Sequence, residues 1–274
     1  VTVSSNNAVG NASTLRIAGR DSVSGGGAFV NIGGLSNSGK PGTGTVNILA
    51  GGRFEVDTSA LVTNAGRPGS FIGVGQGASG TLNISGKSAL TGAASTWAIT
   101  GGSGVTPLVS VGRDGATGSA IVSAGGRWLI SSTHASTTNA TGDTVQLNIG
   151  DRTAGGANPG PNPSIGTVTV TGASSELALI GTSDRYISVG TGNGAIGTLN
   201  VSDGGVARSL SLLVGTGDGS SGTVNVNGGR IELGGTVTSG PAAGTGGSFT
   251  VGRNGGTGTA TFSNGAVLQI STTT

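Results

Sequence analysis

A glycine-rich phrase recurs seven times along this chain, and this repetition constrains the fold more than any single residue does. Two clear copies begin at Phe71 and Tyr186 and read FIGVGQGASGTLNISGKSAL and YISVGTGNGAIGTLNVSDGG. The other copies lie at 29–56, 108–130, 212–233 and 249–270, with one split between 146–150 and 166–170. Such self-similarity is typical of stacked architectures, in which each unit buries its apolar face against its neighbours.

Each copy predicts three short strands. The first strand ends in glycine, as in 186–190; a glycine-rich turn leads to the second, as in 197–201; and a corner leads to the third, as in 53–56. Apolar and polar residues alternate in most of them, which indicates half-buried strands. Glycine suits the corners because tight turns need a positive φ. The predicted closing glycines of the first strands are Gly33, Gly75, Gly112, Gly150, Gly190, Gly215 and Gly252.

The spacing of these glycines favours a coil. The shortest interval, from Gly190 to Gly215, is 25 residues, which fits one three-sided turn of a parallel β-helix. The longer intervals require loops outside the coil. We therefore predict an all-β parallel β-helix (β-solenoid) of about seven coils with loop insertions, forming a single domain over residues 1–274. An antiparallel β-sandwich and a β-propeller, whose blades need about 40–45 residues, are the alternatives.

Alternate apolar residues predict the core of this coil. Loops are predicted at 57–70, 93–107, 131–146, 151–165 and 234–248. Three aromatic residues, Phe54, Trp128 and Phe262, fall on inward positions. Trp97 falls in a predicted loop and is the best exposed candidate for stacking on a sugar, although a role in the core or in anchoring the loop is the simpler interpretation. The predicted inward columns are Val30/Ile32, Ile72/Val74, Val109/Val111, Leu147/Ile149, Ile187/Val189 and Leu212/Val214 in first strands, Val46/Ile48, Leu82/Ile84, Ala120/Val122, Val168/Val170, Leu199/Val201, Val224/Val226 and Ala260/Phe262 in second strands, and Phe54/Val56, Trp128/Ile130, Leu177/Leu179, Ile231/Leu233 and Leu268/Ile270 in third strands.

Composition excludes several classes of function. The chain has no cysteine, which excludes a disulfide scaffold, a thiolate metal site and a cysteine nucleophile. Thirteen Lys and Arg residues oppose eleven Asp and Glu residues, and the cations are spread singly, which argues against nucleic-acid binding. No apolar run approaches the roughly 18 residues of a membrane span, so we expect no membrane insertion by this segment. Because methionine is also absent, we expect a fragment or processed segment of a longer protein.

The phrase V-G-x-G-x-x-x-G-T-L-N-V-S-x-G-G, seen best at 189–205, resembles the glycine-rich repeat of bacterial autotransporter (type V secretion) passengers, which also occurs in some PEP-CTERM surface proteins. The resemblance covers about residues 29–270. It implies a right-handed parallel β-helix, export to the extracellular or outer-membrane surface, and a role in adhesion, aggregation or biofilm contacts. It implies no particular activity, and no catalytic module is recognisable in the chain.

Candidate catalytic groups are few. His134, the only histidine, lies in the loop stretch STHASTTN, which favours a solvated side chain over a metal or pH-sensing role. The carboxylates on or beside third strands are Glu55, Asp57, Glu176 and Glu232, and they could share one face as the acidic groups of β-helical polysaccharide-degrading enzymes do. Ion pairing of Glu55 with Arg53 and of Glu232 with Arg230 is the simpler interpretation, so we expect no enzyme.

Metal binding is weakly indicated. Asp114, in GRDG, and Asp218, in GTGDGSSG, lie in predicted turns and could offer oxygen ligands to calcium. An Asx-type turn explains both residues more simply. We expect no metal site and no cofactor.

Two outward columns on the second strands form the main predicted surface feature, and in a parallel stack each would become a ladder with a repeat of about 4.8 Å. Hydrogen bonding that stabilises a flat, uncharged face is the simplest interpretation. Packing against another rod or a glycan, or an ordered-water surface, are the alternatives. The Thr column is Thr45, Thr81, Ser119, Thr167, Thr198, Thr223 and Thr259, and the Asn column is Asn47, Asn83, Ile121, Thr169, Asn200, Asn225 and Thr261.

The sequence therefore predicts a secreted β-helical adhesin or passenger module whose partners are host or bacterial surface glycans or proteins, or copies of itself. A structural subunit of an extracellular filament or sheath, assembled by end-to-end or lateral packing, is the second hypothesis. A polysaccharide-degrading enzyme is the third. No binding residue is predicted from the sequence.

Overall fold

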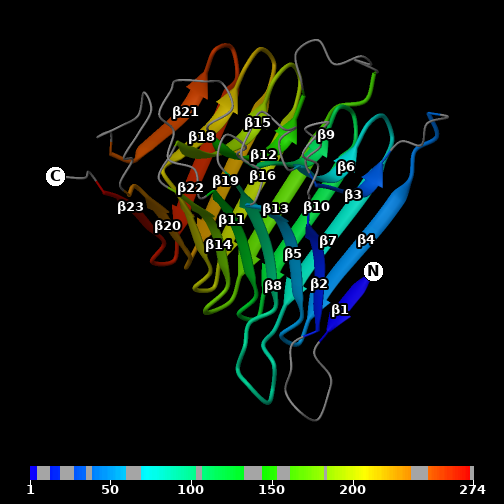
Figure 1. Cartoon of the computed structure of the whole chain (residues 1–274). Helices are drawn as coiled ribbons and strands as arrows, with labels where there is room; N and C mark the ends of the chain where they lie inside the picture. Colours follow the sequence, from blue (N-terminus) through cyan, green and yellow to red (C-terminus); the bar gives the residue numbers. More distant parts are fainter. Residues whose placement is uncertain are drawn as a thin grey trace.

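The chain winds into a parallel β-helix, as a computed structural model shows (Figure 1). The structure describes residues 1–4, 13–18, 28–34, 39–59, 69–102, 107–132, 144–152, 161–181, 184–235 and 246–271. Three parallel sheets run along the stack, and the ends of the chain lie at opposite ends of it (Figure 1). Neither the sandwich nor the propeller fits, because all 23 described strands pair with their neighbours in parallel.

Each coil visits the three sheets in a fixed order, which we call C, A and B. Sheet C holds the predicted first strands: β3 (Phe29–Gly34), β6 (Gly69–Val74), β9 (Leu108–Arg113), β12 (Val145–Asp151), β15 (Arg185–Thr191), β18 (Ser211–Thr216) and β21 (Ser248–Arg253). Sheet A holds the second strands: β1 (Thr2–Ser4), β4 (Thr43–Leu49), β7 (Ser79–Ser85), β10 (Thr117–Ser123), β13 (Ile165–Thr171), β16 (Ile196–Ser202), β19 (Ser221–Asn227) and β22 (Thr257–Ser263). Sheet B holds the third strands: β2 (Thr14–Ala18), β5 (Arg53–Thr58), β8 (Thr96–Gly101), β11 (Arg127–Ser132), β14 (Glu176–Ile180), β17 (Val206–Ser209), β20 (Arg230–Leu233) and β23 (Val267–Ile270).

Seven complete coils follow a partial one made by β1 and β2, which confirms the predicted number. The coils stack in register; for example, Leu199 of β16 lies between Val168 of β13 and Val224 of β19. These three side chains are fully buried. The aliphatic columns therefore run through the middle of the stack, as predicted.

Two columns of glycine hold sheets C and A together at their shared corner. The closing glycine Gly190 has a φ of +68°. Gly197, the second residue of β16, has no such φ, but a Cβ there would lie 2.1 Å from the Ile149 carbonyl oxygen and 2.2 Å from the Gly190 nitrogen. Backbone therefore packs directly on backbone at this corner, and no side chain fits. The equivalent glycines of the other coils are Gly44, Gly80, Gly118, Gly166, Gly222 and Gly258.

Two sequence predictions in the second coil are wrong. The register aligns Ile72 with Ile32 and Val111, so its closing glycine is Gly73 rather than Gly75. Val74 then lies beyond the corner, beside Arg113, and is half-buried instead of inward. The inward residue two positions before Ile72 is Ser70, which is fully buried. The doubled G-x-G pattern of this copy allowed either glycine, and only the neighbouring coils decide between them.

The loop predicted around Trp97 is the third wrong prediction, whereas a core role for this residue is confirmed. The predicted loop 93–107 contains β8, and Trp97 is fully buried on its inward side. Its ring lies 5.1 Å from that of Phe54 and 6.1 Å from that of Trp128, measured between centroids, so the three rings form a stack inside sheet B. Phe54 and Trp128 are core, as predicted, whereas Phe262 lies in an inward column of the last coil and is 38% exposed.

Candidate binding groove

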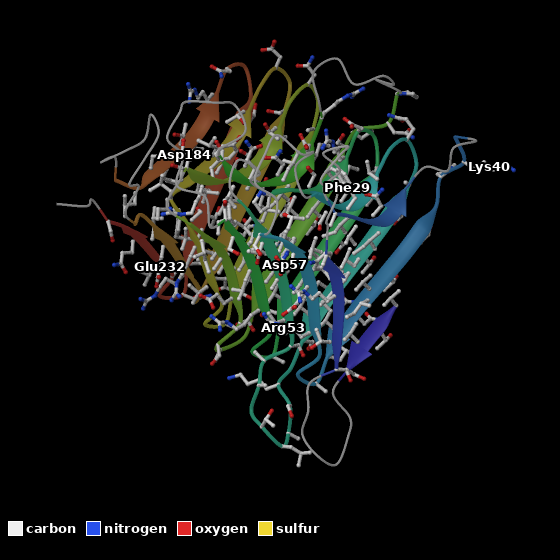
Figure 2. The ribbon with its side chains drawn as sticks, in the orientation of Figure 1. Phe29, Lys40, Arg53, Asp57, Asp184 and Glu232 are labelled. Carbon is white, nitrogen blue, oxygen red and sulfur yellow. The ribbon has the colours of Figure 1, made fainter. Side chains whose placement is uncertain are left out.

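Most of the charged residues that lie within strands are on the outward face of sheet B, where they form two separate clusters. One lies on β2 and β5 and the other spans β11 to β20. Figure 2 labels Arg53 and Asp57 in the first cluster and Glu232 in the second. The four carboxylates that the sequence places on third strands do share this face, as predicted.

In the first cluster, the carboxylates are satisfied by neighbouring arginines. Arg53 pairs with Glu55 on the same strand, as predicted, and Arg16 of β2 pairs with both Glu55 and Asp57. Hydrogen bonds from Ser59 and the proximity of Arg16 lower the pKa of Asp57. This cluster therefore reads as a set of surface ion pairs that join two coils.

The second cluster is a chain of ion pairs across four coils. Arg208 of β17 lies at its centre: its Nε donates to Glu232 at 2.7 Å, and its Nη1 donates to Glu176 at 2.7 Å. At the two ends, Arg127 Nε donates to Glu176 at 2.8 Å, and Arg230 lies 3.4 Å from Glu232. The predicted pair Glu232–Arg230 therefore exists, but Arg208 makes the shorter contact.

A groove of about 610 Å³ opens beside this second cluster, and we call it the sheet B groove. It lies at the carboxyl ends of β14, β17 and β20, where the chain turns toward sheet C. Its polar lining consists of Glu176, Arg185, Arg208, Ser209, Glu232, Gln269 and Ser271, and its apolar lining includes Ala178, Leu179, Ile180 and Leu233.

Unequal loop lengths create the groove. Between β17 and β18 the chain crosses from sheet B to sheet C through Leu210 alone, whose N–H donates to the Arg185 carbonyl at 3.1 Å. In the coils on either side, four residues separate β14 from β15 and fourteen separate β20 from β21. The 25-residue coil is therefore shorter than its two neighbours, which leaves a depression between them. The short spacing is visible in the sequence, but it did not indicate a groove.

Arg185 forms part of the groove wall and is 5% exposed. Its Nη1 donates to the Gly181 carbonyl. Burial lowers the pKa of its guanidinium and raises the pKa of the neighbouring Asp184 carboxyl, because both charges lose hydration. A partly exposed Arg208, a buried Arg185 and the side chain of Gln269 give the groove several donors, and Glu176 and Glu232 supply acceptors.

A third polar cluster lies on sheet C. Asp151 is 7% exposed, accepts a hydrogen bond from Ser110 Oγ at 2.7 Å and lies 3.8 Å from Arg113. The Arg113 guanidinium also stacks over the ring of Phe71, 4.9 Å from its centroid. Burial raises the pKa of Asp151 despite these partners. The cluster ties three coils of sheet C together.

The remaining candidates add no site. Asp114 and Asp218 lie in turns, at 113–116 and 217–220, as predicted. Among the described residues no group of three or more His, Asp and Glu side chains could hold a metal ion. His134 lies outside the described residues. No helix in the described part of the chain has the length and apolarity to cross a membrane.

No protein-family model, curated protein or solved structure matches this chain.

Proposed function

We propose that this chain is an extracellular, bacterial cell-surface adhesion module of the autotransporter-passenger type, and that it holds its ligand in the sheet B groove. The observation that carries the proposal is the concentration of hydrogen-bonding side chains from four coils around one groove on a rigid rod. Such a site, with both donors and acceptors set in fixed positions, suits a hydroxyl-rich glycan or a polar protein segment. The glycine-rich repeat, with its resemblance to passenger domains, supports the surface location.

The same contacts argue against the polysaccharide-degrading alternative. A general acid or nucleophile needs a carboxylate that is free to contact substrate. Glu55, Glu176 and Glu232 are each held by one or more arginines instead. We therefore propose that Glu176 and Glu232 position Arg208, and that all three carboxylates join neighbouring coils.

Binding to an array of bacterial and host surface glycans, and to whole bacterial cells, tests the proposal. The purified chain is compared with Arg208→Ala and with Arg16→Ala, a matched change of an exposed, ion-paired arginine at the far end of sheet B. We expect Arg208→Ala to abolish a signal that Arg16→Ala retains. Equal signals for all three proteins would contradict the groove, and release of sugar fragments that is lost in Glu232→Gln would support the enzyme.

A second candidate function, a subunit of an extracellular filament, is favoured by the two ends of the rod. At the β3 end, a largely apolar groove of about 520 Å³ contains Phe29 and Leu15, which are 53% and 39% exposed. At the other end, Val251, Phe262 and Ile270 are 38–46% exposed. End-to-end stacking of two such segments would cover both sets of apolar side chains. Fibres in negative-stain micrographs that disappear in Phe29→Asp would support this function, and a monodisperse rod at all concentrations would contradict it.

A further inference from the structure

The outward face of sheet A has a composition unlike the rest of the surface. Its eight strands contain no Asp, Glu, Lys or Arg. The register confirms both predicted columns: Thr198 lies between Thr167 and Thr223, and Asn200 lies between Thr169 and Asn225. Seven coils therefore display a flat array of hydroxyl and amide groups, with strands about 4.8 Å apart and alternate residues about 6.6 Å apart along each strand.

The two columns differ in what their polar groups do. In the Asn column, Asn83 donates to Asn47 at 2.8 Å and Asn225 donates to Asn200 at 3.0 Å, so the amides are fixed by each other. No hydrogen bond joins the hydroxyls of the Thr column to another described residue. Each of these hydroxyls is held at a repeated position by the strand beneath it and is open to an external partner. Each threonine also places a methyl group next to its hydroxyl.

This array has the area of a protein interface but lacks the residue types that are typical of one. Eight strands of up to seven residues cover roughly 34 Å by 23 Å, or about 800 Å², close to the area that each partner buries in a stable complex. Interface centres are enriched in aromatic residues and arginine, and sheet A presents neither on this face. Two such faces in contact would bury hydroxyls against hydroxyls with few apolar side chains to offset their dehydration.

An ordered water lattice suits this uncharged, hydroxyl-rich face better than a protein surface does. Water both donates and accepts, so it can satisfy every hydroxyl of the Thr column, and it is uncharged, like the face. The methyl groups and the exposed side chains of Ile121 and Ile196 restrict the orientation of the water next to them. The regular repeat in two directions gives the bound water a periodic order, as a crystal plane of ice has.

We propose that the outward face of sheet A is an ice-binding surface, whose ligand is the ordered water of an ice crystal. This activity is independent of the sheet B groove. It needs the continuous Thr and Asn columns, and it is abolished by a charge placed among them.

The experiment measures partition of the fluorescently labelled chain into a slowly growing ice hemisphere, together with thermal hysteresis. Thr198→Lys is compared with Val206→Lys, which places the same side chain on the outward side of sheet B in the same coil. We expect the wild type and Val206→Lys to enter the ice, and Thr198→Lys to be excluded from it. Circular dichroism verifies the folding of each protein, and Thr223→Lys replaces Thr198→Lys if the latter does not fold.

Exclusion of the wild type from ice overturns the proposal, and so does incorporation of a folded Thr198→Lys or Thr223→Lys chain. Sedimentation velocity at 4 °C tests a competing occupant, a second copy of the chain. A wild-type dimer that Thr198→Lys abolishes would show that the face binds a second copy, which also overturns the proposal. Loss of glycan binding in Arg208→Ala leaves the ice measurement unaffected, so the two sites fail or succeed separately.

Discussion

Sheets A and B pass through the same coils with the same register, yet they hold those coils together in different ways. In sheet A, backbone packs on backbone at the glycine corner and amide ladders join the strands outside. In sheet B, the aromatic stack fills the inside and arginine–carboxylate pairs cross the coils outside. Because glycine and backbone contacts fix the register of sheet A, its outward side chains are not needed for this purpose and can repeat from coil to coil. A register supported by side chains makes the face of sheet B irregular, which is what a selective binding site requires.

Removing the centre of the aromatic stack should have the largest effect on stability. Trp97→Ala is expected to lower the free energy of unfolding by about 3–5 kcal/mol, because Phe54 and Trp128 would border a cavity. Denaturant titration followed by circular dichroism measures the change. Leu129→Ala, an outward, half-buried change on the adjacent strand, is the control and should cost under about 1 kcal/mol. Equal losses in the two variants would show that the stack does not hold sheet B together.

A methyl group at the glycine corner should break sheet A nearly as strongly. Gly197→Ala is expected to cost about 3 kcal/mol, because its Cβ would overlap backbone atoms that cannot move aside without shifting a coil. Gly92→Ala is the matched control. Gly92 has a φ of +68° with no atom within 4 Å of an added Cβ, so its change costs only the backbone conformation, about 1–2 kcal/mol. A Gly197→Ala chain as stable as Gly92→Ala would refute the corner contact.

The ion pairs of sheet B should contribute less, and their contribution should depend on salt. Arg208 is 49% exposed, so Arg208→Ala is expected to lower the free energy of unfolding by no more than about 1 kcal/mol at low salt. At about 1 M salt the loss should shrink, because exposed charges are screened. Thr198→Val on the uncharged face should show no salt dependence. A large, salt-independent loss in Arg208→Ala would mean that this side chain supports the core.

Asp57 and Asp151 have opposite pKa shifts, so their contributions to stability should change in opposite directions as the pH falls. The pKa of Asp57 is lowered in the folded chain, so its charge stabilises the fold above the unfolded value near 3.8 and that contribution is lost as the pH falls through the folded pKa. The pKa of Asp151 is raised by burial, so its charge opposes folding at neutral pH and protonation relieves this cost as the pH approaches 3.8 from above. Asp57→Asn should therefore weaken the chain at pH 7 but not at pH 2, and Asp151→Asn should be most favourable at pH 7. Thermal melts across this range measure both, and parallel pH profiles would contradict the assignment.

The repeat predicts most of the fold because local periodicity determines it. The Thr column, the Asn column and the inward aliphatic columns, apart from Val74, follow from alternation within seven copies, and the register confirms them. Strand β8, which contains Trp97, was missed because the turn from β7 to β8 spans ten residues (86–95), whereas that from β10 to β11 spans three (124–126). The alternating pair Trp97 and Ile99 was the available signal. β17 was missed because its inward residues, Ala207 and Ser209, are too small to show an apolar pattern.

The sheet B groove could not be predicted from the sequence for a different reason. It depends on which of three corners each insertion occupies and on the contacts of Arg208 with carboxylates on the two adjacent coils. Residue spacing along the chain gives the length of an insertion but not the corner at which it leaves the coil. The sequence analysis identified Glu176 and Glu232 as candidates, but it did not identify Arg208, which lies between them.

Both proposed surfaces exist only if successive coils lie in register, and pairs of introduced cysteines test this most directly. The natural chain contains no cysteine. Thr198→Cys with Thr223→Cys joins register partners about 4.8 Å apart, within the range of a disulfide, whereas Thr198→Cys with Asn225→Cys joins diagonal neighbours roughly 8 Å apart, beyond it. Under mild oxidation, followed by mass spectrometry of the monomer, we predict that the first pair forms an intramolecular disulfide and the second does not. Efficient bridging of the diagonal pair alone would contradict the register, and with it the placement of both surfaces.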